Sequence, residues 1–333
     1  MLRIPHYVFL MMAAWALAAC LGSPDCFREE VFCAALVTDT QGLDDHGIHA
    51  DAWLGLQEAQ ENGLADRIDY IESVDSRDYL KNIVYFADRG YDVILTSGIA
   101  LADETLQSAD LKPDSVFVGL SQPFEESRPN LVSVTFPEDQ MGFAAGLLAA
   151  RISRTGIVAG ICETSGIDSM RRYCEGFRAG AEYIPETNVE VLIAYREDGD
   201  SETLFLDDAW GYETASLLAK RGADVIFAAG GGTGQGALRA ASDLGILSIG
   251  AERDQAAVLG ESGSSVVTSF YGAARLEVQE VMRSLRAGGM SGARSGQIQF
   301  VPLGAVFPPN LGIEVDTALK MLENGEILTN VTP

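Results

Sequence analysis

Two stretches of the sequence nearly repeat each other: ADRGYDVILTSG at residues 87–98 and AKRGADVIFAAG at residues 219–230. Each contains the end of a helix, a glycine that stops it, and a buried apolar strand that runs into a second glycine. One such unit occurs in each half of the chain. The repeat predicts two similar lobes in which helices alternate with parallel strands.

Apolar segments on either side of these units extend the same pattern. Several lack polar alternation, which is typical of parallel strands covered by helices on both faces. The expected strands are residues 31–38, 67–73, 91–98, 115–121, 131–136, 156–162, 188–195, 223–230, 246–252 and 265–270. The expected helices are residues 52–62, 77–89, 139–152, 169–183, 208–221 and 233–244. The sequence therefore predicts an α/β fold with two doubly wound parallel-sheet lobes.

Length, charge and motif content limit the function. The 333 residues suffice for two domains with substantial cores. A net charge of −25 argues against nucleic acid or an anionic membrane surface as a partner. No GxSxG motif is present, and no Cys/His pair has a nucleophilic context. Asp207 and Asp208 precede a helical segment and are interpreted as its start. We therefore expect neither an enzyme nor a cofactor.

The N-terminal segment has the pattern of an export signal. Arg3 precedes an apolar run at residues 7–19, shorter than the roughly 20 residues of a membrane-spanning helix. The LAAC sequence at residues 17–20 resembles a bacterial lipobox, which implies a signal peptide at 1–19, lipidation of Cys20 and a tether at 20–31. The protein would then be a membrane lipoprotein facing the periplasm or the exterior. The alternative is a signal cut elsewhere that leaves a free periplasmic protein.

Four cysteines remain when Cys20 is set aside. An even number in an exported chain favours disulfides, and four cysteines allow three connectivities. Proximity in sequence favours Cys26 with Cys33 and Cys162 with Cys174. Four reduced, buried cysteines are the alternative. The spacings match neither a redox CxxC motif nor a zinc site.

The candidate binding site consists of the loops that follow the predicted strands. Ligands of open parallel sheets bind beyond the carboxyl ends of the strands. With two lobes, these loops would face each other across a central cleft. They are residues 39–49, 97–101, 121–124, 163–170, 230–236 and 252–255.

At these loops the chain resembles the basic membrane protein family, lipid-anchored solute-binding receptors best known as purine nucleoside receptors of bacterial ABC importers. The matching motifs are VTDTQGLDDHGIHADAW at 37–53, EGFRAG at 175–180, GADVIFAAGGGTGQG at 222–236 and GAERDQ at 250–255. The resemblance implies a type I periplasmic-binding-protein fold with a hinge crossed more than once. We expect lobe 1 at 32–134 with 252–292, and lobe 2 at 135–251 with 293–333.

The resemblance also implies a ligand site. Asp39 would accept hydrogen bonds from the ligand, Phe205 would stack on a flat ring, and Glu252 would hold ribose hydroxyls. The glycine-rich segment would form a tight turn whose small residues allow close approach to the ligand. The further candidate residues in that turn and at strand ends are Gly231, Gly232, Thr233, Ser97 and Ser121.

Four positions depart from the family's nucleoside site. Ile48 and His49 stand where the family usually has phenylalanine and asparagine, Ser121 replaces an aspartate, and Gly272 falls at or near a ribose-binding lysine. Ile48 can still cover one face of a flat ligand, and His49 is expected to hydrogen-bond it. The predicted ligand is a nucleoside or a related ring-bearing metabolite, delivered to an ABC permease.

Two alternatives stay open at this stage. Asp44, Asp45, His46 and His49 could bind a metal, although aspartates that precede a helix serve naturally as caps of its first turn, and no metal site is expected. The second alternative is a lipoprotein that senses a ligand for a signalling partner without import.

Overall fold

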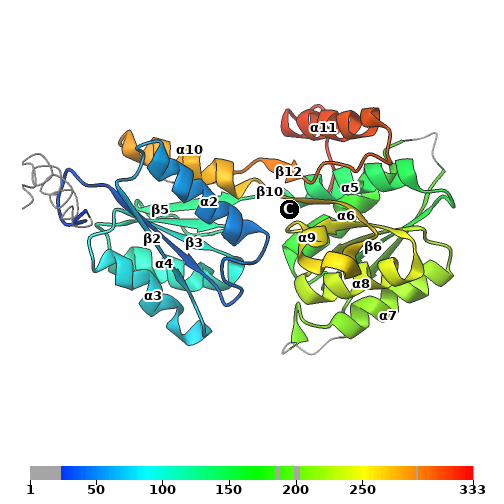
Figure 1. The fold of residues 1–333 in the computed structure, drawn as a ribbon, viewed down its shortest axis with the longest axis horizontal. Coiled ribbons are helices and arrows are strands. Elements are labelled where there is room, and N and C mark those ends of the chain that lie inside the picture. Colours follow the sequence, from blue (N-terminus) through cyan, green and yellow to red (C-terminus); the bar gives the residue numbers. More distant parts are fainter. Residues whose placement is uncertain (1–23, 185–187, 199–202, 290–291, 333) are drawn as a thin grey trace, which may run out of the picture.

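Within residues 24–184, 188–198, 203–289 and 292–332, which the computed structural model describes, the chain forms two six-stranded sheets (Figure 1). Each sheet is the centre of one α/β lobe. The predicted signal peptide and Cys20 lie outside the described residues. No helix within the described range is long and apolar enough to cross a membrane.

Lobe 1 contains a fully parallel sheet with strand order β11-β5-β4-β3-β1-β2. The strands are β1 (Cys33–Thr38), β2 (Arg67–Glu72), β3 (Val93–Ser97), β4 (Val116–Leu120), β5 (Leu131–Thr135) and β11 (Gly292–Ser295). One face is covered by α2 (Ile48–Glu61) and α10 (Ala274–Arg286), the other by α3 (Tyr79–Ala87) and α4 (Ala102–Leu111). Both faces are therefore buried, as the apolar strands predict.

Lobe 2 contains a sheet with strand order β12-β10-β9-β8-β6-β7, parallel except for β12, which pairs antiparallel with β10. The strands are β6 (Ile157–Cys162), β7 (Glu190–Tyr195), β8 (Val225–Ala229), β9 (Leu247–Ala251), β10 (Val266–Gly272) and β12 (Ile298–Phe300). The helices are α5 (Glu138–Ile152), α6 (Asp168–Glu182), α7 (Asp208–Lys220), α8 (Gly231–Leu244), α9 (Gln255–Leu259) and α11 (Pro309–Glu323). Short 3₁₀ helices cover Ser76–Asp78, Ile99–Leu101 and Gly260–Gly263.

In the described residues the chain crosses between the lobes after β5, after β10 and after β11. The crossings are bonded to one another: the Gly296 amide donates to the Thr135 carbonyl (2.7 Å), and the Ala273 amide donates to the Gln297 carbonyl (2.8 Å). The Phe136 ring fills the space beside Gly272, where a Cβ would lie 2.3 Å from the ring. The hinge is therefore a packed unit.

The expected lobe boundaries differ from the structure at two places. We expected the chain to return to lobe 1 at residue 252, but β10 pairs in parallel with β9, with Val266 opposite Ser248. Pairing with β9 satisfies the backbone groups of β10, so this strand extends the second sheet. The return follows Gly272, because α10 packs on α2. The last crossing follows Ser295, since β11 still pairs with β5.

Helices α5 and α6 pack with almost no side chain between them. A Cβ at Gly146 would lie 1.9 Å from the Phe177 carbonyl oxygen, and one at Gly180 would lie 1.9 Å from the Phe143 carbonyl oxygen. Only glycine permits this approach of two backbones. The contact fixes the position of α6 over β6, whose ends carry the loops of the site.

Both cysteine pairs favoured by the sequence are disulfides in the structure. Cys26 is bonded to Cys33 at the start of β1. Cys162, at the end of β6, is bonded to Cys174 on α6. Each disulfide fixes a segment that leads into a lobe or into a site loop.

Candidate functional site

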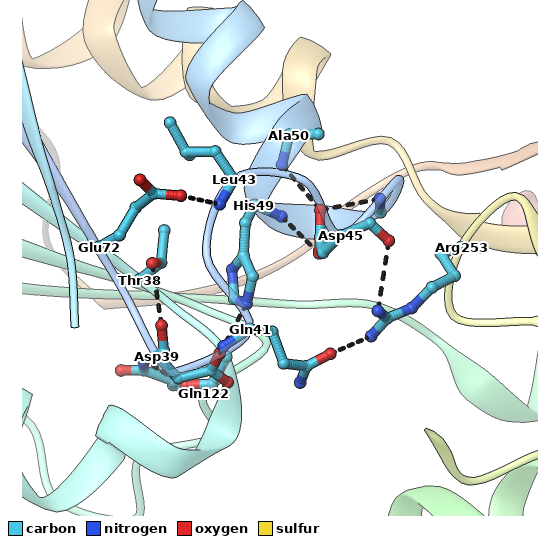
Figure 2. Close-up of polar contacts among 12 residues, drawn as sticks. Thr38, Asp39, Gln41, Leu43, Asp45, His49, Ala50, Glu72, Gln122 and Arg253 are labelled. Carbon is cyan, nitrogen blue, oxygen red and sulfur yellow. Dashed lines mark hydrogen bonds and ion pairs between the residues drawn. The ribbon is translucent and has the colours of Figure 1, made fainter. Parts of the chain in front are cut away.

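The loop after β1 in lobe 1 meets the loop after β9 in lobe 2 (Figure 2). The Asp254 amide donates to the His46 carbonyl (3.1 Å), and Gly47 pairs with Arg253 as an isolated antiparallel bridge. A Cβ at Gly47 would lie 2.7 Å from the Arg253 Cβ. The carboxyl ends of strands from both sheets thus come together, in the arrangement in which α/β proteins bind ligands.

Asp39 lies at the centre of the lobe 1 loop and is only 6% exposed. Its Oδ1 accepts hydrogen bonds from the Gln41 amide (2.8 Å) and from His49 Nε2 (3.1 Å). Burial opposes ionisation, but the hydrogen bond and charge of His49, the Gln41 amide and the charge of Arg253 together hold the pKa of Asp39 below its ordinary value. Asp39 therefore acts as a fixed acceptor.

Asp45 fixes the start of α2. Its carboxylate accepts hydrogen bonds from the backbone amides of Gly47 (2.9 Å), His49 (3.1 Å) and Ala50 (3.0 Å). These amides have no partner within the helix, and the helix dipole favours a negative charge there. The interpretation of an aspartate as a first-turn cap is thus confirmed for Asp45.

The donors considered for a metal site are used in different ways. Asp45 binds backbone amides, His49 binds Asp39, and the exposed Asp44 and His46 are 3.6 Å apart at the surface. Among the residues that the structure describes, no group of three or more His, Cys, Asp or Glu side chains is arranged to hold a metal ion.

The loops after β3 and β4 lie beside Asp39. Gly98 has φ +101°, and a Cβ there would lie 2.8 Å from Asp39 Oδ2, so glycine is required for this approach. Ser97 is fully buried, and its Oγ has no hydrogen-bond partner. Ser121 is half-buried with φ 57°, and its fully buried neighbour Gln122 donates to the Gly98 carbonyl (2.8 Å).

In lobe 2, Phe205 lies in the segment between β7 and α7. Phe205 is half-buried and packs against the main core, and its φ of 64° is in the left-handed region. The Phe205 carbonyl accepts from the Gly232 amide (2.7 Å). A Cβ at Gly231 would lie 2.9 Å from the same carbonyl oxygen. Glycine at position 231 thus makes room for the backbone of Phe205.

The glycine-rich segment is the first turn of α8 and not the separate turn that we expected. The helix begins at Gly231, after Gly230 in the left-handed conformation. The physical reason is that Gly230 and Gly231, both with positive φ (114° and 54°), reverse the chain, after which the segment continues as a helix. Thr233 is buried in that turn, and its Oγ1 accepts from the Asp207 amide (3.1 Å).

Glu252 and Arg253 follow β9. Glu252 has φ 71°, and its Oε2 accepts from the amides of Gly230 (3.3 Å) and Gly231 (3.0 Å). Arg253 donates to the Gln41 side-chain oxygen (2.8 Å) and the Asp45 carbonyl (3.2 Å), and so joins the two lobes. Sequence reasoning placed Arg253 in a motif but missed this link; a charged residue directly after a strand end was the available signal.

The remaining departures from the family pattern have structural explanations. Ile48 is half-buried at the start of α2 and packs on the main core. Gly272 lies against the Phe136 ring, so no larger side chain fits there without moving Phe136. At the position where the family has a ribose-binding lysine, this chain has a glycine that packs against Phe136 in the hinge.

An apolar pocket of about 350 Å³ lies apart from these residues. It is lined by residues of β12, α11 and their connection, including Phe300, Leu303, Phe307 and Ile313. None of the strand-end loop residues described in this section lines it. The meeting point of the strand-end loops is the better candidate site, because it gathers buried polar groups from both lobes.

Two parallel-sheet lobes, repeated crossings and facing strand-end loops define a type I periplasmic-binding-protein fold, the fold of two-lobed solute-binding proteins. A solute-binding protein of an ABC transporter system from Conexibacter woesei has a TM-score of 0.73 at 22% identity, covering 89% of this chain and 98% of that one. One from Aeropyrum pernix K1 has a TM-score of 0.68 at 19% identity, covering 91% and 94%. The predicted fold class is confirmed.

The family model described as ABC transporter substrate-binding protein PnrA-like matches residues 32–289, and the chain belongs to this family. The ABC transporter nucleoside-binding protein BmpA of Lactococcus lactis is 30% identical over 63% of this chain and 58% of its own length. The CD4+ T-cell-stimulating antigen of Listeria monocytogenes is 31% identical over 67% of this chain. The match spans 63% of that antigen's length. Basic membrane protein A of Borreliella burgdorferi is 26% identical over 86% of this chain and 84% of its own length.

Proposed function

We propose that the protein is an extracytoplasmic receptor that binds a nucleoside or a related ring-bearing metabolite between its lobes and delivers it to an ABC permease. Lipid on Cys20 would anchor it to the membrane. The family assignment supports the receptor class, and the relative from Lactococcus lactis is named for nucleoside binding.

The observation that carries this proposal is a set of buried polar atoms without hydrogen-bond partners. Among the described residues these are His49 Nδ1, Ser97 Oγ, Arg253 Nε and Glu277 Oε2. Glu277 forms an ion pair with Arg294 (2.8 Å), whereas the other three belong to the strand-end loops around Asp39. Buried polar atoms are almost always hydrogen-bonded. A polar ligand would supply the missing partners.

The aromatic ring of Phe205 supports a flat ligand. Phe205 is half-buried on a site loop and packs against the main core. Its exposed part would offer a surface for stacking, and stacking of a base on an aromatic ring contributes about 1–3 kcal/mol. Asp39 would bind the ligand from lobe 1, and Phe205 and Glu252 would bind it from lobe 2. A ligand that contacts both lobes favours the closed state by its higher affinity for that state.

The test is titration calorimetry of the mature protein with nucleosides, bases, sugars and amino acids. We expect a nucleoside to bind and Asp39→Asn to weaken it about 10- to 150-fold, the equivalent of about 1.5–3 kcal/mol for a charged hydrogen bond. Asp44→Asn is the matched control, because the Asp44 side chain is 98% exposed in the same loop. Binding of sugars or amino acids but no nucleoside or base would refute the ligand class.

A further inference from the structure

A buried ion pair lies behind the loop that carries Phe205. Glu163 follows β6 and is fully buried, and Arg196 follows β7 and is 3% exposed. Arg196 Nη1 donates to Glu163 Oε1 (2.8 Å). The Arg196 amide also donates to the Glu163 carbonyl (2.7 Å). Burying two charged side chains this completely costs desolvation free energy. The other contacts of the pair indicate what structural role offsets that cost.

Further contacts of this pair are with the segment that carries the ring, including the Thr203 hydroxyl, to which Arg196 Nη2 donates. Glu163 Oε2 accepts from the Phe205 amide (3.2 Å), and Arg196 Nε donates to Asp207 Oδ2 (2.9 Å). Asp207 in turn accepts from the Trp210 amide (3.1 Å) at the start of α7. The ion pair thus fixes the chain at Phe205 itself and two residues after it.

Phe205 requires such support because of its backbone conformation. Left-handed φ values are uncommon for residues other than glycine and persist only when the surroundings enforce them. The neighbouring glycines leave space for the same arrangement. A Cβ at Gly230 would lie 2.8 Å from the Glu163 Cβ, and one at Gly231 would lie 3.2 Å from the Phe205 Cβ.

We propose that Glu163 and Arg196 are positioning residues that hold the Phe205 ring in place for a flat ligand and thereby set selectivity for ring-bearing ligands. This inference rests on the proposed function, in which Phe205 contacts the ligand. Glu163 and Arg196 act through the Phe205 backbone and need not touch the ligand themselves.

The central experiment is a double-mutant cycle with Glu163→Gln and Phe205→Ala, read by calorimetry with the tightest-binding nucleoside of the panel. Glu163→Gln keeps the size of the side chain and removes its charge. We expect each single change to weaken binding about tenfold or more, and the double variant to bind as Phe205→Ala does. If the fold-losses of affinity in the two single variants multiply in the double variant, the inference is overturned, because Glu163 then acts independently of the ring.

Glu197→Gln is the matched control. Glu197 is adjacent to Arg196, but it is exposed and its carboxylate contacts Thr164 and Ser165. The Glu197→Gln variant should bind nucleoside with the affinity of the wild type. Arg196→Lys keeps the positive charge but loses the planar fork that reaches both carboxylates. We expect Arg196→Lys to lose less nucleoside affinity than Glu163→Gln does. In the Phe205→Ala background, Arg196→Lys should cause no further loss of affinity.

Hydrogen exchange tests the positioning without any ligand. In Glu163→Gln the amides of Phe205 and Gly232 should exchange faster, with the rest of lobe 2 unchanged. Faster exchange throughout lobe 2 would mean that the pair serves general stability, and would overturn the inference. If the wild type binds no nucleoside, the proposed function fails, and exchange still decides whether the ion pair fixes the loop.

Discussion

At the scale of single residues, the charge of Asp39 organises the lobe 1 loop. The carboxylate is buried, accepts from His49 and Gln41, and lies against Gly98. Its ionised form is thus part of the folded loop, and not only a group available to a ligand. This has a consequence for stability at low pH.

The pKa of Asp39 is lowered in the folded protein, despite burial, by His49, Gln41 and Arg253. The ionised carboxylate therefore stabilises the fold above the unfolded pKa of about 3.9, and this contribution is lost as the pH falls through the lower folded value. We expect the difference in unfolding free energy between wild type and Asp39→Asn to narrow as the pH falls from about 5 to below 4. Urea unfolding of both proteins at several pH values measures this difference. A difference that does not change with pH would contradict the lowered pKa of Asp39.

Some residue roles could be predicted from the sequence and others could not. Asp45 follows a strand and precedes a helix, so its capping role followed from local rules. The link from Arg253 to Gln41 and the packing of Phe136 on Gly272 join residues far apart in sequence. No local pattern specifies such contacts, because they depend on how the two lobes meet.

At the scale of elements, the strands were the most predictable part. β1 to β10 were each predicted, most of them from an apolar run and β2 from the alternating RIDYIE, with small differences at their ends. β11 and β12 were missed, since GARS and IQF are short and lack such a run. α4, α9, α10 and α11 were not among the expected helices either. For α10 a reason is visible in the sequence. The buried face of α10 includes Glu277, which interrupts the apolar stripe.

The contact between α5 and α6 gives a prediction at this scale. Gly180→Ala places a Cβ 1.9 Å from the Phe143 carbonyl oxygen, so the helices must separate. Overpacking of this kind costs about 1–3 kcal/mol of stability. Replacing glycine by alanine in a helix gains about 1 kcal/mol of helix propensity. We expect the overpacking cost to be the larger of the two, because the backbones of α5 and α6 must move apart. We expect a lower midpoint of thermal unfolding, measured by circular dichroism.

Gly312→Ala is the control for that experiment. Gly312 lies in α11, and a Cβ there meets nothing within 4 Å. This substitution should stabilise the protein by about 0.5–1 kcal/mol through helix propensity alone. Equal effects of the two alanine substitutions would contradict the packing argument.

At the scale of the whole molecule, the loops after β1 and β9 contact each other directly and so join the lobes. Arg253 supplies two hydrogen bonds across the interface, and the Asp254 amide supplies a third to the His46 carbonyl. We expect Arg253→Ala to shift the ligand-free protein toward an open state, since fewer contacts then favour closure.

Small-angle X-ray scattering checks this expectation. The radius of gyration of ligand-free Arg253→Ala should exceed that of the wild type, and a bound ligand should reduce the difference. Arg77→Ala is a suitable control, because the Arg77 side chain is 88% exposed on lobe 1 and forms its ion pair with nearby Asp75. Identical scattering of Arg253→Ala and wild type would exclude a role in closure.

The attachment of the N-terminal segment to lobe 1 has a mechanical consequence. The described chain begins beside β2, where Arg67 donates to the Pro24 carbonyl (3.3 Å), and the Cys26–Cys33 disulfide ties this segment to β1. An anchor at Cys20 would therefore hold lobe 1 stationary relative to the membrane. Lobe 2, which carries Phe205 and the Glu163–Arg196 ion pair, would then move relative to the membrane, and the three crossings would act as the hinge.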